Sequence, residues 1–259
     1  MARTKWAAFP HPAKAFTYAG DALKKSWEKL HRGDCEPYPK DPGVQEAWRL
    51  FHQGKFAEAT ALGLEAGGAG VTAANKAQAI YANGMEPKEA AKIALFEEVM
   101  RRAEKQAREE PKNANAHYLH AYAAGRYSQR ISVAKALAQG YGGKIRAALE
   151  AALKLEPRHA EAHIAMGAYH AEIIDKMGSL VGGLTYGAKK EAGEEHFRKA
   201  LKLAPDSPIA HVEMANGLVM MHGKKALAEA AKLYSKAAGL APRDAMEKLD
   251  VEAAKAELE

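Results

Sequence analysis

The sequence predicts an all-α protein built from stacked helical hairpins. From Pro42 onward, Ala-rich segments carry charged residues at helical spacing and show almost no β-branched alternation. Pro and Gly interrupt these segments at intervals, as expected at the ends of helices. With 47% hydrophobic and 27% charged residues, the chain of 259 residues can form a core and keep a solvated exterior. We expect a globular helical protein, and no apolar run is long enough for a membrane span.

Residues 1–42 have a different character, and we expect an extended arm that contains one short helix. The arm is rich in Trp, Phe, Tyr and Pro, and its basic residues account for most of the net charge of +6. Asp21 is a candidate N-cap, and Gly33 predicts the end of the helix. Leu23, Trp27 and Leu30 share one apolar face. Because so short a helix is marginal alone, we expect it to dock on the rest of the chain rather than on a partner or a membrane.

Internal repetition begins after the arm. Four prolines each follow an Ala-rich amphipathic helix, at spacings of 46, 48 and 37 residues: Pro111, Pro157, Pro205 and Pro242. A histidine stands six residues after each of the first three prolines: His117, His163 and His211. These spacings exceed the ~34 residues of a bare helical hairpin repeat. The sequence therefore predicts helical hairpins with insertions.

The repeats resemble the tetratricopeptide repeat (TPR), whose pattern is W-x2-L-G-x2-Y, then A-x3-F, then P. Residues 163–205 fill these slots in order, with Phe197 at the aromatic position, and residues 211–242 fill them again. A weaker copy covers residues 117–157, and residues 47–59 indicate another hairpin. The resemblance implies a degenerate TPR-like superhelix over residues 43–243, followed by an acidic helix or tail at 244–259.

Two Gly-rich insertions separate the helices of their repeats, at residues 132–143 and 178–187. Together with the acidic C-terminal segment, they resemble the helical TatT-type component of tripartite transporters. They are also similar to the C-terminal domain of the regulator of microtubule dynamics family. The TatT resemblance implies a link to the transport of a small ligand, and the insertions are long enough to cover a groove.

In a TPR array the first helix of each hairpin lines the concave face, and the resemblance assigns that face a mixed set of side chains. Aromatic, amide and charged groups of this kind suit a peptide or a small amphipathic ligand. The alternative is an ordinary solvated inner face. The candidate binding residues are Asn115, Tyr118, Tyr122, Arg126, Gln129, Glu161, His170, Glu172 and Asn216.

Eleven histidines raise the question of a metal, and His163 and His170 share a helical face with Glu172. Both histidines, however, fill the Trp and Tyr slots of the repeat, where side chains pack between helices. His159 stands at an N-cap position, as Asn113 and Ser207 do in neighbouring repeats. We therefore expect structural histidines and no metal or other cofactor, with a metal-dependent hydrolase as a minor alternative.

Two further motifs fail as catalytic sites. Gly143 and Lys144 end a Gly-rich run, but Ala138 and Ile145 occupy positions where a phosphate-binding loop needs Gly and Ser or Thr. Cys35 lies four residues from His31, but no third group is evident to orient such a pair. We expect glycines that permit tight turns, and an unreactive thiol.

These patterns predict a non-catalytic helical-repeat protein that binds a protein or peptide partner in its concave groove. The alternative is a carrier or relay for a small amphipathic molecule or organic acid. The interleaved charges after residue 32 offer no basic stripe for nucleic acid. The single cysteine fits a reducing compartment. The apolar stretch after the first charged residues, Trp6 to Phe9, is too short for a secretory signal, so we expect a cytoplasmic protein. A homo-oligomer remains an alternative, because one thin solenoid does not readily cover the aromatic residues Trp48, Phe51 and Phe56.

Overall fold

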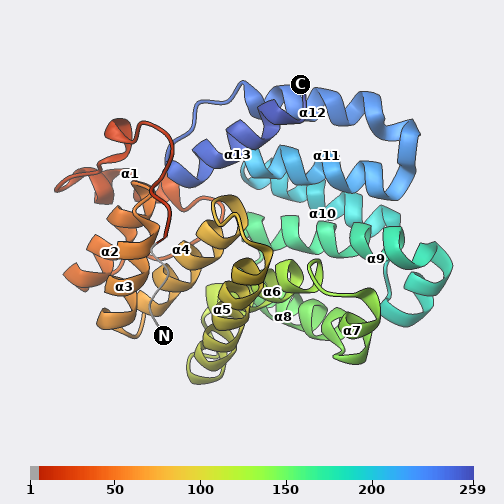
Figure 1. The fold of residues 1–259 in the computed structure, drawn as a ribbon, viewed down its shortest axis with the longest axis horizontal. Coiled ribbons are helices and arrows are strands. Elements are labelled where there is room, and N and C mark those ends of the chain that lie inside the picture. Colours follow the sequence, from red (N-terminus) through yellow and green to blue (C-terminus); the bar gives the residue numbers. More distant parts are fainter. Residues whose placement is uncertain (1–5) are drawn as a thin grey trace.

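The computed structural model describes residues 6–259, and every regular element within them is a helix (Figure 1). The all-α prediction and the arrangement in TPR-like hairpins are confirmed. Five antiparallel hairpins follow one another: α2 (Pro42–His52) with α3 (Phe56–Ala66), α4 (Gly70–Gly84) with α5 (Glu89–Glu109), α6 (Ala114–Ser128) with α8 (Tyr141–Leu155), α9 (Ala160–Tyr186) with α10 (Lys190–Leu203), and α11 (Pro208–His222) with α12 (Leu227–Ala238). The remaining helices are α1 (Ala22–Leu30), α7 (Val133–Ala138), α13 (Ala245–Ala256) and the 3-10 turns η1 (Lys14–Phe16) and η2 (Gly223–Ala226).

The α4/α5 hairpin is the one that the repeat pattern does not delineate. Helix α4 is buried on nearly all sides, and its packing surface consists largely of alanines such as Ala73, Ala77 and Ala82. A helix that is buried all round has no polar face, so it shows little amphipathic periodicity. Pro111 after α5 fits the repeat pattern, but Ala103 stands eight residues before it, where Phe197 precedes Pro205, so the aromatic signal is missing.

Side-chain caps begin several first helices. The Asp41 carboxylate accepts from the amides of Gly43 and Val44, and Asn113 accepts from that of Ala116. His159 acts in the same way through Nδ1, which accepts from the Ala162 amide at 3.0 Å, so its predicted N-cap role is confirmed. Ser207 occupies the equivalent position without a capping hydrogen bond.

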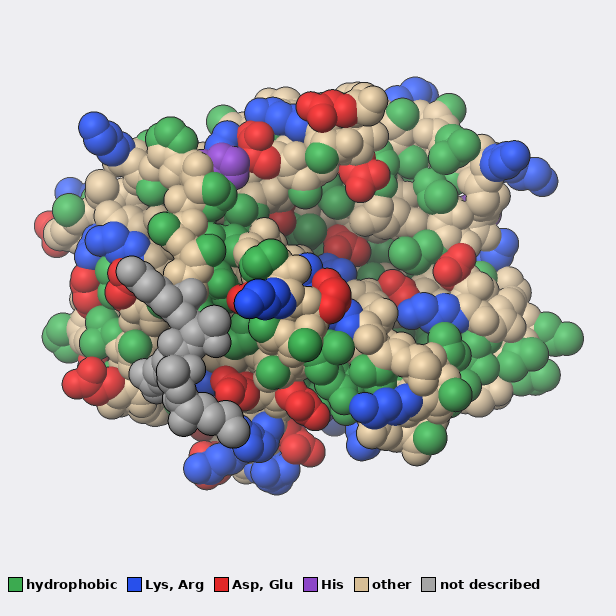
Figure 2. Space-filling model, in the orientation of Figure 1, with side chains coloured by type: hydrophobic (Ala, Val, Ile, Leu, Met, Phe, Trp, Pro, Cys, Tyr) green, Lys and Arg blue, Asp and Glu red, His purple; other side chains and the backbone are tan. Residues whose placement is uncertain are grey.

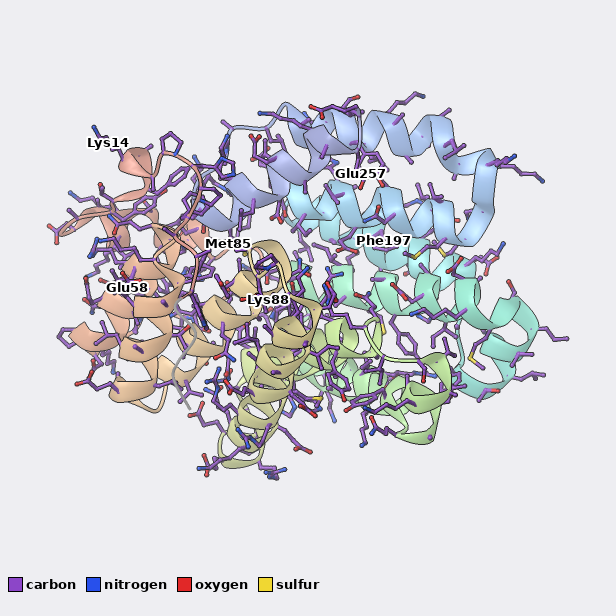
Figure 3. All side chains as sticks on the ribbon, in the orientation of Figure 1. Lys14, Glu58, Met85, Lys88, Phe197 and Glu257 are labelled. Carbon is purple, nitrogen blue, oxygen red and sulfur yellow. The ribbon has the colours of Figure 1, made fainter. Side chains whose placement is uncertain are left out.

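Phe197 of α10 is the central contact of the most complete repeat pattern. It is fully buried and packs between α9 and α11, the region where it is labelled in Figure 3. A Cβ added at Gly167 of α9 would lie 2.8 Å from the Phe197 ring, and one at Gly217 of α11 would lie closer still. Glycine at both positions therefore allows the two backbones to approach the ring from either side.

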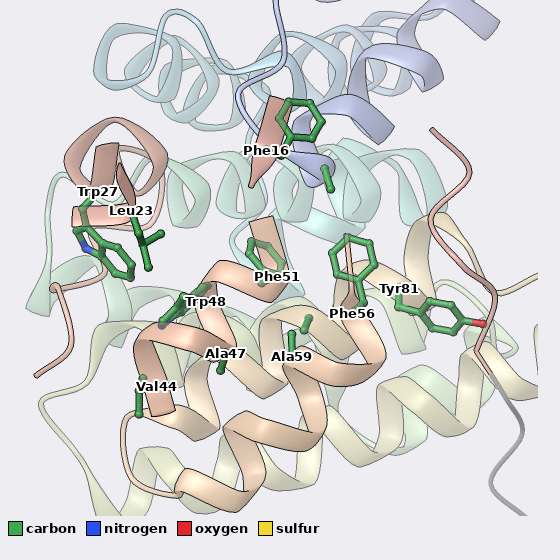
Figure 4. Close-up of a cluster of buried hydrophobic side chains, with 13 residues drawn as sticks. Phe16, Leu23, Trp27, Val44, Ala47, Trp48, Phe51, Phe56, Ala59 and Tyr81 are labelled. Atoms are coloured by element: carbon green, nitrogen blue, oxygen red, sulfur yellow. The ribbon is translucent and has the colours of Figure 1, made fainter. Parts of the chain in front are cut away.

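The arm packs against the first hairpin. Its side chains Phe16, Leu23 and Trp27 are buried against Trp48 and Phe51 in one apolar cluster (Figure 4). Trp48, Phe51 and Phe56 are at most 2% exposed. The apolar face that suggested a homo-oligomer is thus covered by the protein's own arm, and that reason for oligomerisation is removed.

The end of α1 differs from the prediction. The helix stops at Leu30, and Gly33 lies beyond it without the left-handed conformation of a terminal glycine. Instead the Gly33 carbonyl accepts from the amide of Glu161 at the start of α9, at 2.9 Å. A Cβ on Gly33 would lie 3.0 Å from the Glu161 carboxylate. Glycine at position 33 therefore leaves room for the close approach of the arm to α9.

The segment after α12 leads back to the first hairpin, where α13 begins, and α13 then runs toward the last hairpin (Figure 1) and contacts α11, α12 and α2. Leu249 packs against Gly84 at the end of α4, and the Asp244 carboxylate lies 2.8 Å from Nδ1 of His52 on α2. The arm also touches this segment, since the Tyr18 hydroxyl donates to the Arg243 carbonyl. The two ends of the array are thus joined, and the superhelix is closed rather than open.

We predict that Gly217→Ala destabilises the protein by about 1–3 kcal/mol, because the new methyl group overpacks the Phe197 site. Gly143→Ala is the matched control: this helical glycine has no atom near the added methyl group, so that variant should gain about 0.5–1 kcal/mol. Urea unfolding of both variants measures the two effects. Equal stability of the two variants would show that Phe197 does not need the glycines.

Candidate functional site: a pocket on the concave face

A cavity of about 190 Å³ lies on the concave face, between the first helices of the hairpins and α13. Figure 2 shows this side of the molecule hollowed near its middle, with hydrophobic and acidic side chains in the recess. Helices α6 and α9 contribute most of the walls, and α4, α7, α8, α11 and α13 complete them. The lining is mainly apolar and aromatic, and includes Ile80, Tyr118, Ala121, Tyr122, Leu137, Tyr141, Ile164, Tyr169, Ile209, Met246 and Leu249.

Six of the nine candidate residues line this pocket together: Tyr118, Tyr122, Arg126, Gln129, Glu161 and Glu172. They come from two neighbouring first helices, α6 and α9, at helical spacings that place them on one face. The structure brings these six side chains together on the concave side, whereas Asn115 of α6 and His170 of α9 lie outside the lining. That the six residues bind a ligand stays a prediction.

The other three candidates lie elsewhere. The Asn115 amide nitrogen donates to the Glu36 carboxyl at 2.6 Å and to the Asp34 carbonyl at 3.0 Å, so this side chain holds the arm. His170 is buried, and its Nδ1 accepts from the Lys189 amide. Asn216 accepts from the Tyr234 hydroxyl of α12. Each of these polar groups has found a partner within the fold.

The charged groups of the pocket are largely paired with one another. Arg126 donates to Glu213 of α11 at 2.6 Å and lies over the Tyr122 ring. Burial opposes the charge of Arg126, but Glu213 raises its pKa above the ordinary value. Glu172 accepts from Gln129 and pairs with Lys176, each at 2.8 Å. Arg126 is therefore already neutralised and is less available to an acidic ligand than the sequence alone suggests.

Gly125 is a pocket residue that the sequence analysis did not select. It stands inside α6, lines the pocket, and a Cβ added to it would meet no atom within 4 Å. Glycine in a helix interior costs about 1 kcal/mol relative to alanine. No neighbour requires that cost here, in contrast to Gly167 and Gly217. A glycine in the last turn of the predicted helix was the available signal, although sequence alone does not distinguish open space from close packing.

The two insertions and the C-terminal helix also contribute walls that the repeat pattern did not assign. Val133 and Leu137 of α7 lie at one side, together with Met177 and Tyr186 around the second insertion. That insertion does not loop out: Gly178 takes a positive φ of 76°, which kinks α9, and the helix then continues to Tyr186. Helix α13 adds Met246, Leu249 and Asp250 from the opposite side.

A buried ionic network lies at one end of the pocket. Lys76 of α4 pairs with Asp34 of the arm and, at 2.8 Å, with the pocket residue Glu161. Burial opposes the ionisation of Asp34, but Lys76 and His31 hold its pKa well below the ordinary value. Burial likewise opposes the charge on Lys76, and the two carboxylates raise its pKa. The arm is thus attached to α4 and α9 through charges that are withdrawn from water.

Two uncharged groups extend this network. Burial, followed by the charge of Asp34, raises the pKa of Glu36 from 4.5 to about 8, so this side chain is largely protonated at neutral pH. Burial lowers the pKa of His159 to about 3, so the imidazole is neutral. Its Nε2 lies 2.9 Å from the Asn115 amide oxygen, and the tautomer protonated on Nε2 satisfies both this contact and the helix cap.

Cys35 and the histidines take structural positions. Burial and the nearby Glu156 raise the pKa of Cys35 to about 11, and its thiol lies 3.5 Å from the Arg158 carbonyl. His31 faces Asp34 and His52. His163 contacts His196 of α10 at 2.8 Å, between the helices of its hairpin. Within residues 6–259 no three His, Cys, Asp or Glu side chains are grouped so as to hold a metal ion.

Comparison with known proteins supports the fold. No family model matches the chain, and no curated protein matches it by sequence. Among solved structures, the chain is similar to the crystal structure of TTC0263, a thermophilic TPR protein of Thermus thermophilus. The TM-score is 0.59 at 18% identity, and the match covers 83% of this chain and 97% of that one. The chain therefore has a TPR-like helical-repeat fold, a fold whose concave surfaces commonly bind proteins.

No helix within the described part of the chain combines the length and apolar character needed to cross a bilayer.

We predict that Lys76→Met destabilises the protein by about 3–5 kcal/mol, because Asp34 and Glu161 would be left as uncompensated buried charges. Lys105→Met is the control, since Lys105 and its partner Glu109 are exposed and such pairs contribute only about 0–1 kcal/mol. Chemical unfolding of both variants provides the comparison. A loss for Lys76→Met no greater than that of the control would mean that the network does not hold the arm.

Glu36→Gln should stabilise the protein at pH 8 and have little effect at pH 5. Because the folded-state pKa of Glu36 is raised, its stabilising protonation is fully present below pH 4.5 and is lost as the pH rises through about 8. The amide of the variant stays neutral at both pH values. The unfolding free energy of the variant relative to the wild type should therefore increase by roughly 2–4 kcal/mol from pH 5 to pH 8. Urea unfolding at both pH values, with the exposed Glu58→Gln as control, measures this. A gain that does not change with pH would contradict the assignment.

Proposed function

We propose that this chain is a non-catalytic binding protein that receives a segment of a partner protein in its concave pocket. The observation that carries the proposal is the open, mainly apolar pocket in which α6 keeps Gly125 where packing does not require a glycine. Gly143 of α8 also faces open space but lies outside the pocket lining, so the pocket around Gly125, and not the glycine alone, supports the proposal. We interpret the space in front of Gly125 as room for a bound group.

The walls of the pocket support the binding of an amphipathic group. Tyr118, Tyr122 and Tyr169 present large aromatic surfaces, and such rings dominate the energetics of interfaces. Gln129 and Ser128 are polar lining residues at the α6 end, and they donate to Glu172 and to the Gly125 carbonyl within the fold. An apolar cavity with a few polar groups is the usual form of a binding site in a protein of this size.

The second candidate is a carrier for a small amphipathic molecule, and two observations favour it. Helix α13 and the arm occupy parts of the concave face, so the space that remains is short compared with an open groove. The insertions around α7 and Tyr186 form part of its walls. These features agree with the resemblance to the transporter-associated helical proteins. We also propose a reducing, cytoplasmic setting, which the single unpaired Cys35 supports.

To test the proposal, we compare Gly125→Leu with Gly143→Leu. Both glycines are helical and face open space, but Gly125 lines the pocket and Gly143 does not. We expect Gly125→Leu to fold normally and to lose the bound partner or ligand, because the leucine side chain occupies the space that the bound group needs. The affinity should fall at least tenfold, which corresponds to about 1.4 kcal/mol or more of binding free energy. Gly143→Leu should bind as the wild type does.

Native mass spectrometry on each protein, purified gently from its own organism, provides the measurement. A bound protein would favour the partner hypothesis, and a bound mass of a few hundred daltons would favour the carrier. If both variants retain the bound species equally, the concave pocket is not the binding site.

A further inference from the structure

Asp250 of α13 differs from the other acidic residues of the pocket. Within residues 6–259, five side chains have a buried nitrogen or oxygen without a hydrogen-bond partner, and of these five only Asp250 lines the pocket. Its Oδ2 atom is the unpartnered one. A buried acceptor without a donor costs about 1–3 kcal/mol, and more when it is charged. Such a group in a binding pocket indicates that its donor belongs to the ligand.

The other carboxylates of the pocket already have partners. Glu161 is held by Lys76, Glu172 by Lys176 and Gln129, and Glu213 by Arg126. The same pairs neutralise the basic residues of the pocket, Arg126 and Lys176. Asp250 is therefore the carboxylate of this lining to which the described residues supply neither a donor nor a salt bridge.

The surroundings of Asp250 are acidic. Burial raises its pKa well above the ordinary value, and the charges of Glu247, Asp244, Glu161 and Glu213 raise it further. The negative potential that disfavours ionisation of Asp250 in the empty pocket favours a cation placed beside it. An incoming anion would meet the opposite effect.

The pocket that Asp250 lines is mainly apolar. Met246 and Leu249 lie on the same helix as Asp250, and Ile209 of α11 and Ile164 and Ala168 of α9 line the same pocket. A fully hydrated cation gains little in such a place, whereas a charged group on an apolar stem can bury the stem and keep one strong hydrogen bond.

We propose that the pocket binds the ammonium group of an amphipathic ligand at Asp250, with the apolar stem of that ligand among the isoleucines, leucines and tyrosines. The inference rests on the proposed function, because it names the chemical class of what the pocket receives. The ammonium comes either from a free amine or from a lysine side chain of a partner, and the same contact serves both.

The first experiment measures binding of hexylamine, hexanol and hexanoate by isothermal titration calorimetry at neutral pH. Hexylamine should bind most tightly, hexanol more weakly and hexanoate weakest. Asp250→Asn should weaken hexylamine binding about tenfold or more, the range of a charge-assisted hydrogen bond, and leave hexanol unchanged. Asp175→Asn, an exposed acidic residue of α9 outside the pocket lining, is the matched control and should change neither.

A second arm distinguishes the two sources of the ammonium. A blocked leucine-rich peptide with one central lysine is compared with the same peptide carrying norleucine in place of the lysine. Preference for the lysine peptide over hexylamine would assign the ammonium to a protein partner, and preference for hexylamine would assign it to a free amine. Either result supports the role of Asp250 if Asp250→Asn weakens binding of the preferred probe, and equal binding of that probe to Asp250→Asn contradicts it.

The outcomes separate this inference from the function on which it rests. If hexanol and hexanoate bind as tightly as hexylamine, and Gly125→Leu abolishes all three, the pocket is a binding site but the amine assignment is wrong. If hexylamine binds equally to Asp250→Asn and the wild type, the assignment is also wrong. If neither the three probes nor the two peptides bind, and no bound species is found in the native protein, both proposals fail.

Discussion

Lys76 neutralises two buried carboxylates that are far apart in the sequence, Asp34 of the arm and Glu161 at the start of α9. Burial disfavours the charge of each of these groups, and the pairing of the ammonium with the two carboxylates offsets that penalty. The position of the arm is therefore coupled to the position of α9 and, through α9, to one wall of the pocket. Replacing a whole buried ion pair by well-packed apolar residues is often neutral for stability, whereas removing one partner is costly. The same contact that holds the arm thus also sets Glu161 in place.

The network continues from the arm toward the C-terminus. His31 contacts both Asp34 and His52, and His52 contacts Asp244, which caps α13 by accepting from the amide of Glu247. The first hairpin and the last helix are joined in this way, and a solenoid that would otherwise be open becomes closed. Closure places α13 across the concave face, which brings Asp250 into the pocket. The proposed ammonium site is therefore a product of closure and not of any single repeat.

The concave residues of the central repeats were predictable because they depend on local periodicity. Tyr118, Tyr122 and Arg126 follow one face of α6, and a residue three or four positions away on a helix always lies on the same side. Asn115 lies on that face too, but the arm covers it, and no pattern within α6 reveals what another segment covers. Gly33 was assigned to a helix end, whereas its actual constraint is the Glu161 side chain, more than a hundred residues later. Contacts of that range leave no trace in local spacing.

By itself, the sequence determined the helical hairpins, the slots filled by Phe197 and the histidines, and the helix faces that turn inward. These features follow from periodicity, capping and the steric demand of one aromatic ring, all of which act over a few residues or one repeat. The tertiary structure alone decided the closure of the array, the burial of Trp48 beneath the arm, the open space at Gly125 and the position of Asp250, whose Oδ2 receives no hydrogen bond from residues 6–259. Those outcomes depend on the balance of buried charges and packed surfaces between segments distant in the chain, which only the complete fold brings together.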